Sequence, residues 1–130
     1  MSKTLSSALR RFLAQSIRSV EQLELILHLQ RTPAQYWDAE SVASRLSMRA
    51  DTAAASLEAL AGESLLDVRL GETIRYRYGP ATDALRELVR QLGEAWRTDR
   101  STVLGLFTVR QPLQDFSDAF RIGNDGDEDG

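Results

Sequence analysis

With 130 residues, of which 42% are hydrophobic and 27% charged, the chain has the composition of one globular domain, and no apolar run approaches the roughly 18 residues that a membrane span needs. The absence of cysteine excludes a disulfide framework, a thiol nucleophile and a thiolate metal site, and it suits a cytoplasmic protein. Four of the 19 acidic residues lie in the last eight positions, so the rest of the chain has 15 acidic and 16 basic residues, which argues against a strongly basic, non-specific nucleic-acid binder.

Residues 1 to 18 are predicted to form an amphipathic helical arm. Their apolar positions follow helical spacing at Leu5, Leu9, Phe12, Leu13 and Ile17. A helix of this length is not stable in isolation. We therefore expect it to dock on its own domain or on a second subunit.

Three helices are predicted between residues 19 and 62. Ser19 is the expected cap of the first, with Gln22 reaching back as in a capping box, and the helix that follows is apolar over more than half its circumference, as in a central helix. Asp38 is the expected cap of the second helix. The inward face of the third helix is expected to consist of Ala50, Ala53, Leu57 and Leu60.

A β-hairpin is predicted next, because hydrophobic residues begin to alternate with polar ones. Its turn is placed at Gly71 and Glu72. Its apolar face would consist of Leu66, Val68, Leu70, Ile74, Tyr76 and Tyr78. Its other face carries Arg69, Arg75 and Arg77.

Residues 81 to 122 are predicted to be helical. A long helix begins at Thr82, and a polar step at residues 99 to 101 either kinks it or splits it in two. Pro112 ends this pattern, and a short amphipathic helix follows at residues 113 to 120. Residues 123 to 130, rich in glycine and acidic residues, are expected to be a disordered tail.

We expect no catalytic, metal or cofactor site. The sequence lacks a phosphate-binding loop, a nucleophile elbow and a zinc-binding His-Glu-x-x-His motif, so an enzyme is not expected. His28, the only histidine, lies in an apolar helix without a partner nearby in sequence, which favours a structural role. The acidic tail matches the first half of an EF-hand calcium-binding loop. It lacks the second half, with the bidentate glutamate that such a loop needs, so no calcium site is expected.

Three helices followed by a two-stranded hairpin is the order of a winged helix-turn-helix, and residues 19 to 80 resemble this domain of bacterial transcriptional regulators. Residues 37 to 48 are similar to the second helix and turn of such proteins, and residues 57 to 66 to the end of the third helix. The long helix after the wing resembles the dimerising helices of MarR-like and PadR-like regulators, without distinguishing the two families. The expected fold is mostly α with a small β-hairpin, a winged helix-turn-helix with helical extensions at both ends.

The resemblance implies that the third helix enters the major groove of DNA and that the wing approaches phosphates. The DNA-binding residues are then expected to be Arg45, Arg49, Thr52, Ser56, Arg69, Arg75 and Arg77. It also implies a homodimer formed by the C-terminal helices. The interface is expected to contain Leu85, Leu88, Leu92, Trp96, Val103 and Phe107.

Two functions remain open at this point. The first is a dimeric winged-helix DNA-binding transcriptional regulator. Against it, Arg49 is the only basic residue expected on the reading face of the third helix, where Asp51 and Glu58 would face phosphate. The alternative is a winged-helix protein-protein interaction module without DNA binding, with the hairpin, the N-terminal arm or the C-terminal helix as its docking element. A membrane-surface role is discounted because the C-terminal segment is acidic.

Overall fold

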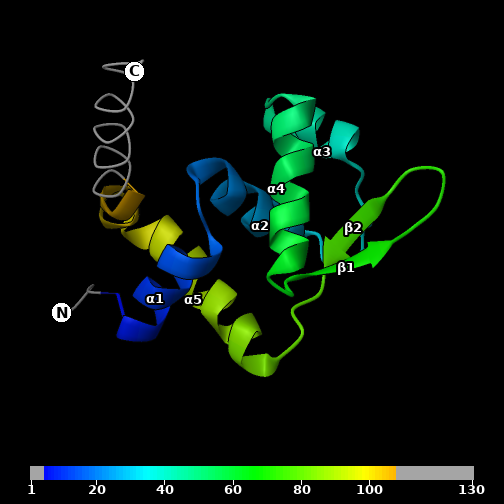
Figure 1. Cartoon of the computed structure of the whole chain (residues 1–130). Coiled ribbons are helices and arrows are strands. Elements are labelled where there is room, and N and C mark those ends of the chain that lie inside the picture. The colour runs from blue at the N-terminus through cyan, green and yellow to red at the C-terminus, as the bar shows by residue number, and fades with distance from the viewer. Residues whose placement is uncertain (1–4, 108–130) are drawn as a thin grey trace, which may run out of the picture. The chain divides into compact units, whose positions relative to one another are not determined.

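The computed structural model describes residues 5 to 107, which divide between two compact units at Thr98 and Asp99. In the second unit, residues 100 to 107 are helical up to the last described residue. The predicted helix at residues 113 to 120 and the acidic tail lie outside the described residues. The elements of the first unit, shown in Figure 1, are α1 (Ser7–Ser16), α2 (Val20–Arg31), α3 (Ala39–Leu46), α4 (Ala50–Gly62), β1 (Leu66–Arg69), β2 (Arg75–Tyr78) and α5 (Asp83–Thr98).

Helix α2 is the centre of the core, as its broad apolar surface predicts. It packs against α4, β2 and α5, and its buried apolar residues are Leu23, Leu25, Ile26, Leu27 and Leu29. Ser19 caps the helix by accepting a hydrogen bond from the Gln22 N–H. The Gln22 side chain accepts from the N–H of Arg18 and not from that of Ser19, so the predicted reciprocal capping box is wrong by one residue.

The N-terminal arm docks on its own domain. Helix α1 packs against α5 and buries Leu9, Phe12 and Leu13. The Ser6 hydroxyl donates to Gln91 Oε1 of α5, with an O···O distance of 3.3 Å. The Ser16 hydroxyl donates to Glu63 at the end of α4, at 3.0 Å. Both ends of the arm are therefore tied to the helices that follow it in sequence.

Helices α3 and α4 form a helix-turn-helix pair. Asp38 caps α3 as predicted, accepting a hydrogen bond from the Ser41 N–H at 2.8 Å. Ser47 ends α3 in the left-handed conformation, with φ of 59°. Ala53, Leu57 and Leu60 of α4 are buried as expected. Ala50 is exposed, so its predicted inward position is wrong, because the first turn of α4 extends beyond the core.

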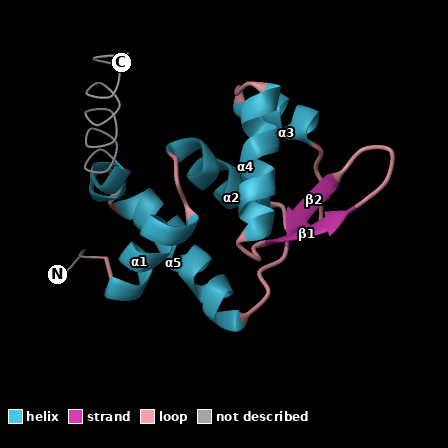
Figure 2. Ribbon diagram, viewed as in Figure 1, coloured by secondary structure: helices cyan, strands magenta, loops and turns pink. Residues whose placement is uncertain are grey.

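The hairpin is antiparallel, with Leu66 opposite Tyr78 and Val68 opposite Tyr76. Its predicted apolar face is correct at its inner end, where Leu66, Tyr76 and Tyr78 are buried. It is wrong at the outer end, where the exposed fractions are 47% for Val68, 77% for Leu70 and 44% for Ile74. For Leu70 and Ile74 the physical reason is visible in Figure 2, where the loop between the strands projects away from the helices that cover their inner end.

Helix α5 ends at Thr98 and a helix resumes at Arg100, so the predicted polar step splits the long helix in two. In α5, Val89, Leu92 and Ala95 are buried, and the helix packs against α1 and α2. Of the residues predicted for a dimer interface, Leu92 in the first unit and Val103 and Phe107 in the second are buried, and the interface itself stays a prediction. Leu85, Leu88 and Trp96 are partly exposed.

Candidate nucleic-acid interface

The outward face of α4 is the surface that a helix-turn-helix presents to DNA. Its exposed residues recur at helical spacing and are Asp51, Ala55, Glu58 and Gly62. Thr52 is half-buried at the edge of this face. Ser56 is 4% exposed, so the prediction that it contacts DNA is wrong, because its position in the helix turns it toward the core with Ala53 and Leu57. The outward face is therefore small and partly acidic.

Two arginines lie at the turn between α3 and α4. Arg49 immediately precedes α4, and its guanidinium donates two hydrogen bonds to the Asp51 carboxylate, at 3.1 and 2.8 Å. Both side chains are largely exposed, and such surface pairs contribute little to stability. Arg45 is exposed too, with its guanidinium carbon 5.9 Å from the centre of the Trp37 ring. Both side chains are therefore exposed, Arg49 at the start of α4 and Arg45 on α3 beside Trp37.

The outer face of the sheet carries the three predicted arginines together with two carboxylates. The register places Asp67 opposite Arg77 and Arg69 opposite Arg75. A β-bridge between Trp37 and Tyr76 adds a third chain segment to the sheet. Since side chains alternate along a strand, the bridge puts Tyr36 and Asp38 on the arginine face. This face has three positive and two negative side chains, a formal charge of +1.

Contacts within this face hold two of the three arginines. The Arg77 guanidinium donates to the Asp67 carboxylate at 3.0 Å, and this hydrogen bond raises the pKa of Arg77. The guanidinium carbons of Arg69 and Arg77 lie 4.2 and 4.6 Å from the centre of the Tyr36 ring, within the range of cation–π attraction. The Tyr36 ring thus holds the guanidinium groups of Arg69 and Arg77 beside the sheet.

Asp38 joins this face to the start of α3. Hydrogen bonds from the backbone and side chain of Ser41 are the main reason that the pKa of Asp38 is lowered, and the positive charge of Arg75 lowers it further. Asp38 and Asp67 were not among the predicted interface residues. The alternation of Asp67 with Arg69 could have revealed Asp67, whereas Tyr36 and Asp38 reach the sheet only through the Trp37 bridge.

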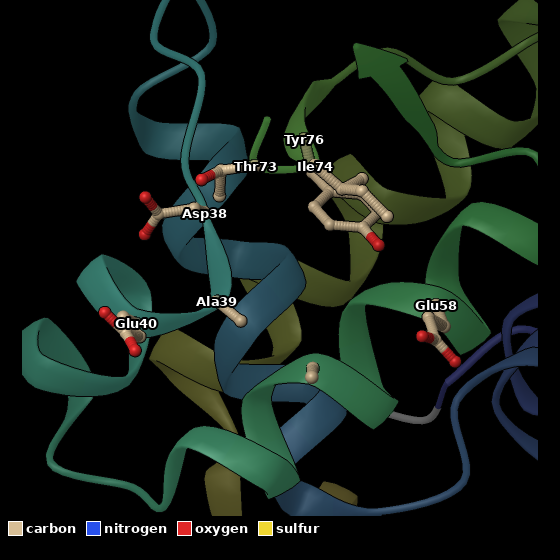
Figure 3. A pocket seen from close by; sticks show the side chains of 8 residues that line it. Asp38, Ala39, Glu40, Glu58, Thr73, Ile74 and Tyr76 are labelled. Carbon is tan, nitrogen blue, oxygen red and sulfur yellow. The ribbon is translucent and has the colours of Figure 1, made fainter. Parts of the chain in front are cut away.

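A pocket of about 330 Å³ lies between the start of α3, the middle of α4 and the hairpin (Figure 3). It is lined by Asp38, Ala39, Glu40, Ala54, Glu58, Thr73, Ile74 and Tyr76. Three of these residues are acidic and none is basic. Burial, followed by the negative charge of Glu58, raises the pKa of Tyr76, so this hydroxyl is neutral at physiological pH. The pocket repels phosphate at the centre of the candidate interface.

His28 lies beneath this surface in a structural setting. It is buried and packs edge-on against Trp37, with ring centres 4.7 Å apart. Its pKa is lowered by burial and by the positive charges of Arg31 and Arg45. Across residues 5 to 107, no group of three or more His, Cys, Asp or Glu residues could hold a metal ion. Within the same range, no helix is long and apolar enough to cross a membrane.

Three features identify the fold class. They are the order of the helices, the helix-turn-helix pair α3–α4, and a hairpin bridged by the segment before α3. The fold is a winged helix-turn-helix. The predicted fold is therefore confirmed, whereas neither a MarR-like nor a PadR-like family is singled out. Neither a protein-family model nor a curated protein matches the sequence.

Solved structures with a similar fold exist. A possible transcriptional regulator from Methanosarcina mazei Go1 is 12% identical over 78% of this chain and 88% of its own, with a TM-score of 0.52. RV1404 from Mycobacterium tuberculosis is 19% identical over 95% of this chain and 84% of its own, with a TM-score of 0.51. The homodimeric winged helix-turn-helix DNA-binding domain of Mb0332 from Mycobacterium bovis, a possible ArsR-family regulator, is 21% identical over 73% of this chain and 92% of its own, with a TM-score of 0.49. At these identities, the likeness to the regulator from Methanosarcina mazei and to RV1404 establishes the fold alone.

Proposed function

We propose that this chain is a winged-helix DNA-binding protein that regulates transcription. The observation that carries the proposal is the placement of α4, which follows a tight turn after α3, exposes one face and has Arg49 at its N-terminal end, with a second exposed arginine, Arg45, in the last turn of α3. In winged-helix proteins this end of the helix meets base edges and phosphates in the major groove. The Arg49–Asp51 pair is exposed, so Arg49 can exchange the carboxylate for a phosphate at small cost.

The wing supplies the second contact. Arg75 is exposed, and among the described residues it makes no ion pair, although its charge acts on Asp38. Arg69 stacks on Tyr36 and keeps its hydrogen-bond donors available at the ring face. Because Glu40 and Glu58 line the pocket that α3, α4 and the hairpin share, phosphate contacts are expected outside this pocket. We therefore expect modest affinity per chain, with strong dependence on salt.

A homodimer would double these contacts. We propose that it forms through the part of α5 that the core leaves partly exposed, at Leu85 and Leu88. These residues lie one turn apart on the same side of the helix. A dimer with two α4 helices would bind two half-sites and compensate for the weak contact made by each.

The proposal is tested by removing the turn arginines. The double variant Arg45→Ala/Arg49→Ala should bind a labelled duplex at least tenfold more weakly, and the slope of log affinity against log salt should fall by about 2. The matched control is Arg18→Ala/Arg97→Ala, which removes the same charge from exposed positions outside α3, α4 and the hairpin. Equal loss in both variants would show a general charge effect and would contradict the proposed site.

A protein-protein interaction module is the second candidate, and one observation favours it. Val68, Leu70 and Ile74 expose an apolar cluster at the outer end of the hairpin, where a DNA-binding wing would be served better by basic side chains. This candidate predicts no duplex binding at low salt and loss of partner binding on replacement of the cluster. Its simplest separate test is Leu70→Ser, which leaves all three wing arginines in place.

A further inference from the structure

The pocket beside α4 contains carboxylates without a matching positive charge. Among residues 5 to 107, Glu40 and Glu58 appear in no ion pair and in no side-chain hydrogen bond. Figure 3 shows them on opposite sides of the pocket, Glu40 from α3 and Glu58 from α4. The Asp38 carboxylate does not belong with these two, because it caps α3 and lies under the positive charge of Arg75. A ligand for this pocket is therefore a cation.

The same pocket has an apolar wall. Ala39, Ala54 and Ile74 line it beside the ring of Tyr76. Ile74 is 44% exposed and lies next in space to the loop that carries Leu70, so the wall continues into the exposed end of the hairpin. Exposed apolar side chains beside a polar rim are typical of protein-contact sites. The cation must therefore be attached to an apolar body.

A bare metal ion and a nucleic acid do not meet these requirements. The acidic residues do not converge as a metal-ligand group in the described part of the chain. Phosphate is repelled by the two glutamates. The volume of about 330 Å³ is near the lower end of the range for small-molecule sites, which suits one long side chain and its neighbours rather than a whole helix.

We propose that this pocket docks a short segment of a partner protein in which an arginine or lysine is flanked by apolar residues. The basic side chain enters between Glu40 and Glu58, and its apolar neighbours cover Ile74 and the hairpin end. The long aliphatic stem of either basic residue suits the alanine-lined wall. This docking does not depend on DNA binding, although an occupant here would lie on the same side of α4 that the DNA proposal uses.

The test uses the full chain and a peptide of sequence GSLRILSG, with NMR amide shifts as the readout. The peptide should shift the amides of Thr73 and Ile74 and saturate at a Kd below about 1 mM. A peptide with citrulline in place of arginine keeps the shape and removes the charge, and it should bind at least fivefold more weakly. A peptide with serine in place of its apolar residues should also lose at least fivefold.

Two protein variants locate the binding. Glu40→Gln/Glu58→Gln should weaken binding of the arginine peptide at least fivefold, whereas Glu21→Gln/Glu24→Gln on α2, with the same change of charge at exposed positions, should not. Ile74→Ser should weaken binding without altering net charge. Equal affinity for the arginine and citrulline peptides, equal loss in both double variants, or no shift at the pocket up to about 5 mM peptide would each overturn the proposal.

Discussion

The backbone of Trp37 exchanges two hydrogen bonds with the backbone of Tyr76, each with an N···O distance of 2.8 Å. The Trp37 indole N–H donates to the Thr32 hydroxyl at 3.1 Å, and its ring packs against His28 of α2. Trp37, in the segment that precedes α3, therefore joins the hairpin to the central helix α2. The relative placement of α4 and the wing arginines depends on this connection.

Replacing Trp37 should destabilise the domain in two steps. Trp37→Phe removes the indole hydrogen bond but keeps a ring, and it should lower the free energy of unfolding by about 1 kcal/mol. Trp37→Ala also opens a cavity beside His28 and should cost about 3 to 5 kcal/mol. Urea denaturation at neutral pH measures both. A Trp37→Ala variant as stable as Trp37→Phe would contradict a packing role for the ring.

His28 should make stability depend on pH in a mildly acidic range. Burial lowers its pKa below the ordinary 6.5, so the unfolded chain binds the proton more readily than the folded one. The stability contribution is therefore complete above about pH 6.5 and is lost as the pH falls from there through the folded pKa. Asp38 and Glu87, the latter with its pKa lowered to about 2, act in the same direction but in a more acidic range.

The variant His28→Phe isolates this effect, because it keeps a ring against Trp37 and cannot titrate. Its unfolding free energy should change less than that of the wild type between about pH 7.5 and pH 5.5. It should also be as stable as the wild type or more so at neutral pH, because His28 Nε2 is buried without a hydrogen-bond partner among the described residues. If the unfolding free energy of His28→Phe changed with pH as much as that of the wild type, another titrating group would be responsible for the pH dependence.

Gly79 should tolerate a side chain only when Asp67 is removed. A Cβ atom at Gly79 would lie 2.7 Å from Asp67 Cγ, so the carboxylate would have to move away from Arg77. Gly79→Ala should cost about 0.5 to 1 kcal/mol, because Asp67 is exposed and can move away at the loss of its ion pair with Arg77. In an Asp67→Ala background the same change should cost much less, because the atoms that clash are absent. Equal costs in the two backgrounds would refute this contact as the cause.

The proposed dimer is tested at Leu85 and Leu88. Sedimentation equilibrium at micromolar concentration should give a dimer for the wild type and a monomer for Leu85→Glu/Leu88→Glu. Arg97→Glu, an exposed change on the same helix, is the control and should remain dimeric. A monomeric wild type would remove the dimer from the account, and circular dichroism would confirm that each variant is folded.

The helices and the hairpin could be predicted from sequence because their signals are local. Ser19 and Asp38 mark helix starts by cap chemistry, and the alternation through Tyr76 and Tyr78 marks a strand. Burial at the ends of elements could not be predicted in this way. Val68 and Leu70 have the same periodicity as Leu66, but the helices cover only the inner end of the hairpin.

The candidate interface was less predictable for a related reason. The arginines of the wing are evident in sequence, but their neutralisation depends on strand register and on a bridge from residues 36 to 38. The resemblance to winged-helix regulators implies surface roles for Ser56 and Leu92, whereas tertiary packing buries both side chains. The pocket combines side chains from three elements, and no local pattern contains it.

Duplex binding by the wild-type chain tests the central claim most directly. Fluorescence anisotropy with a labelled random duplex should be measured at low salt, about 50 mM, and at about 150 mM. We expect binding at low salt that weakens steeply at the higher concentration, as for a few arginine–phosphate contacts. No binding at low salt would contradict it and would leave the apolar hairpin end and the acidic pocket as the functional surface.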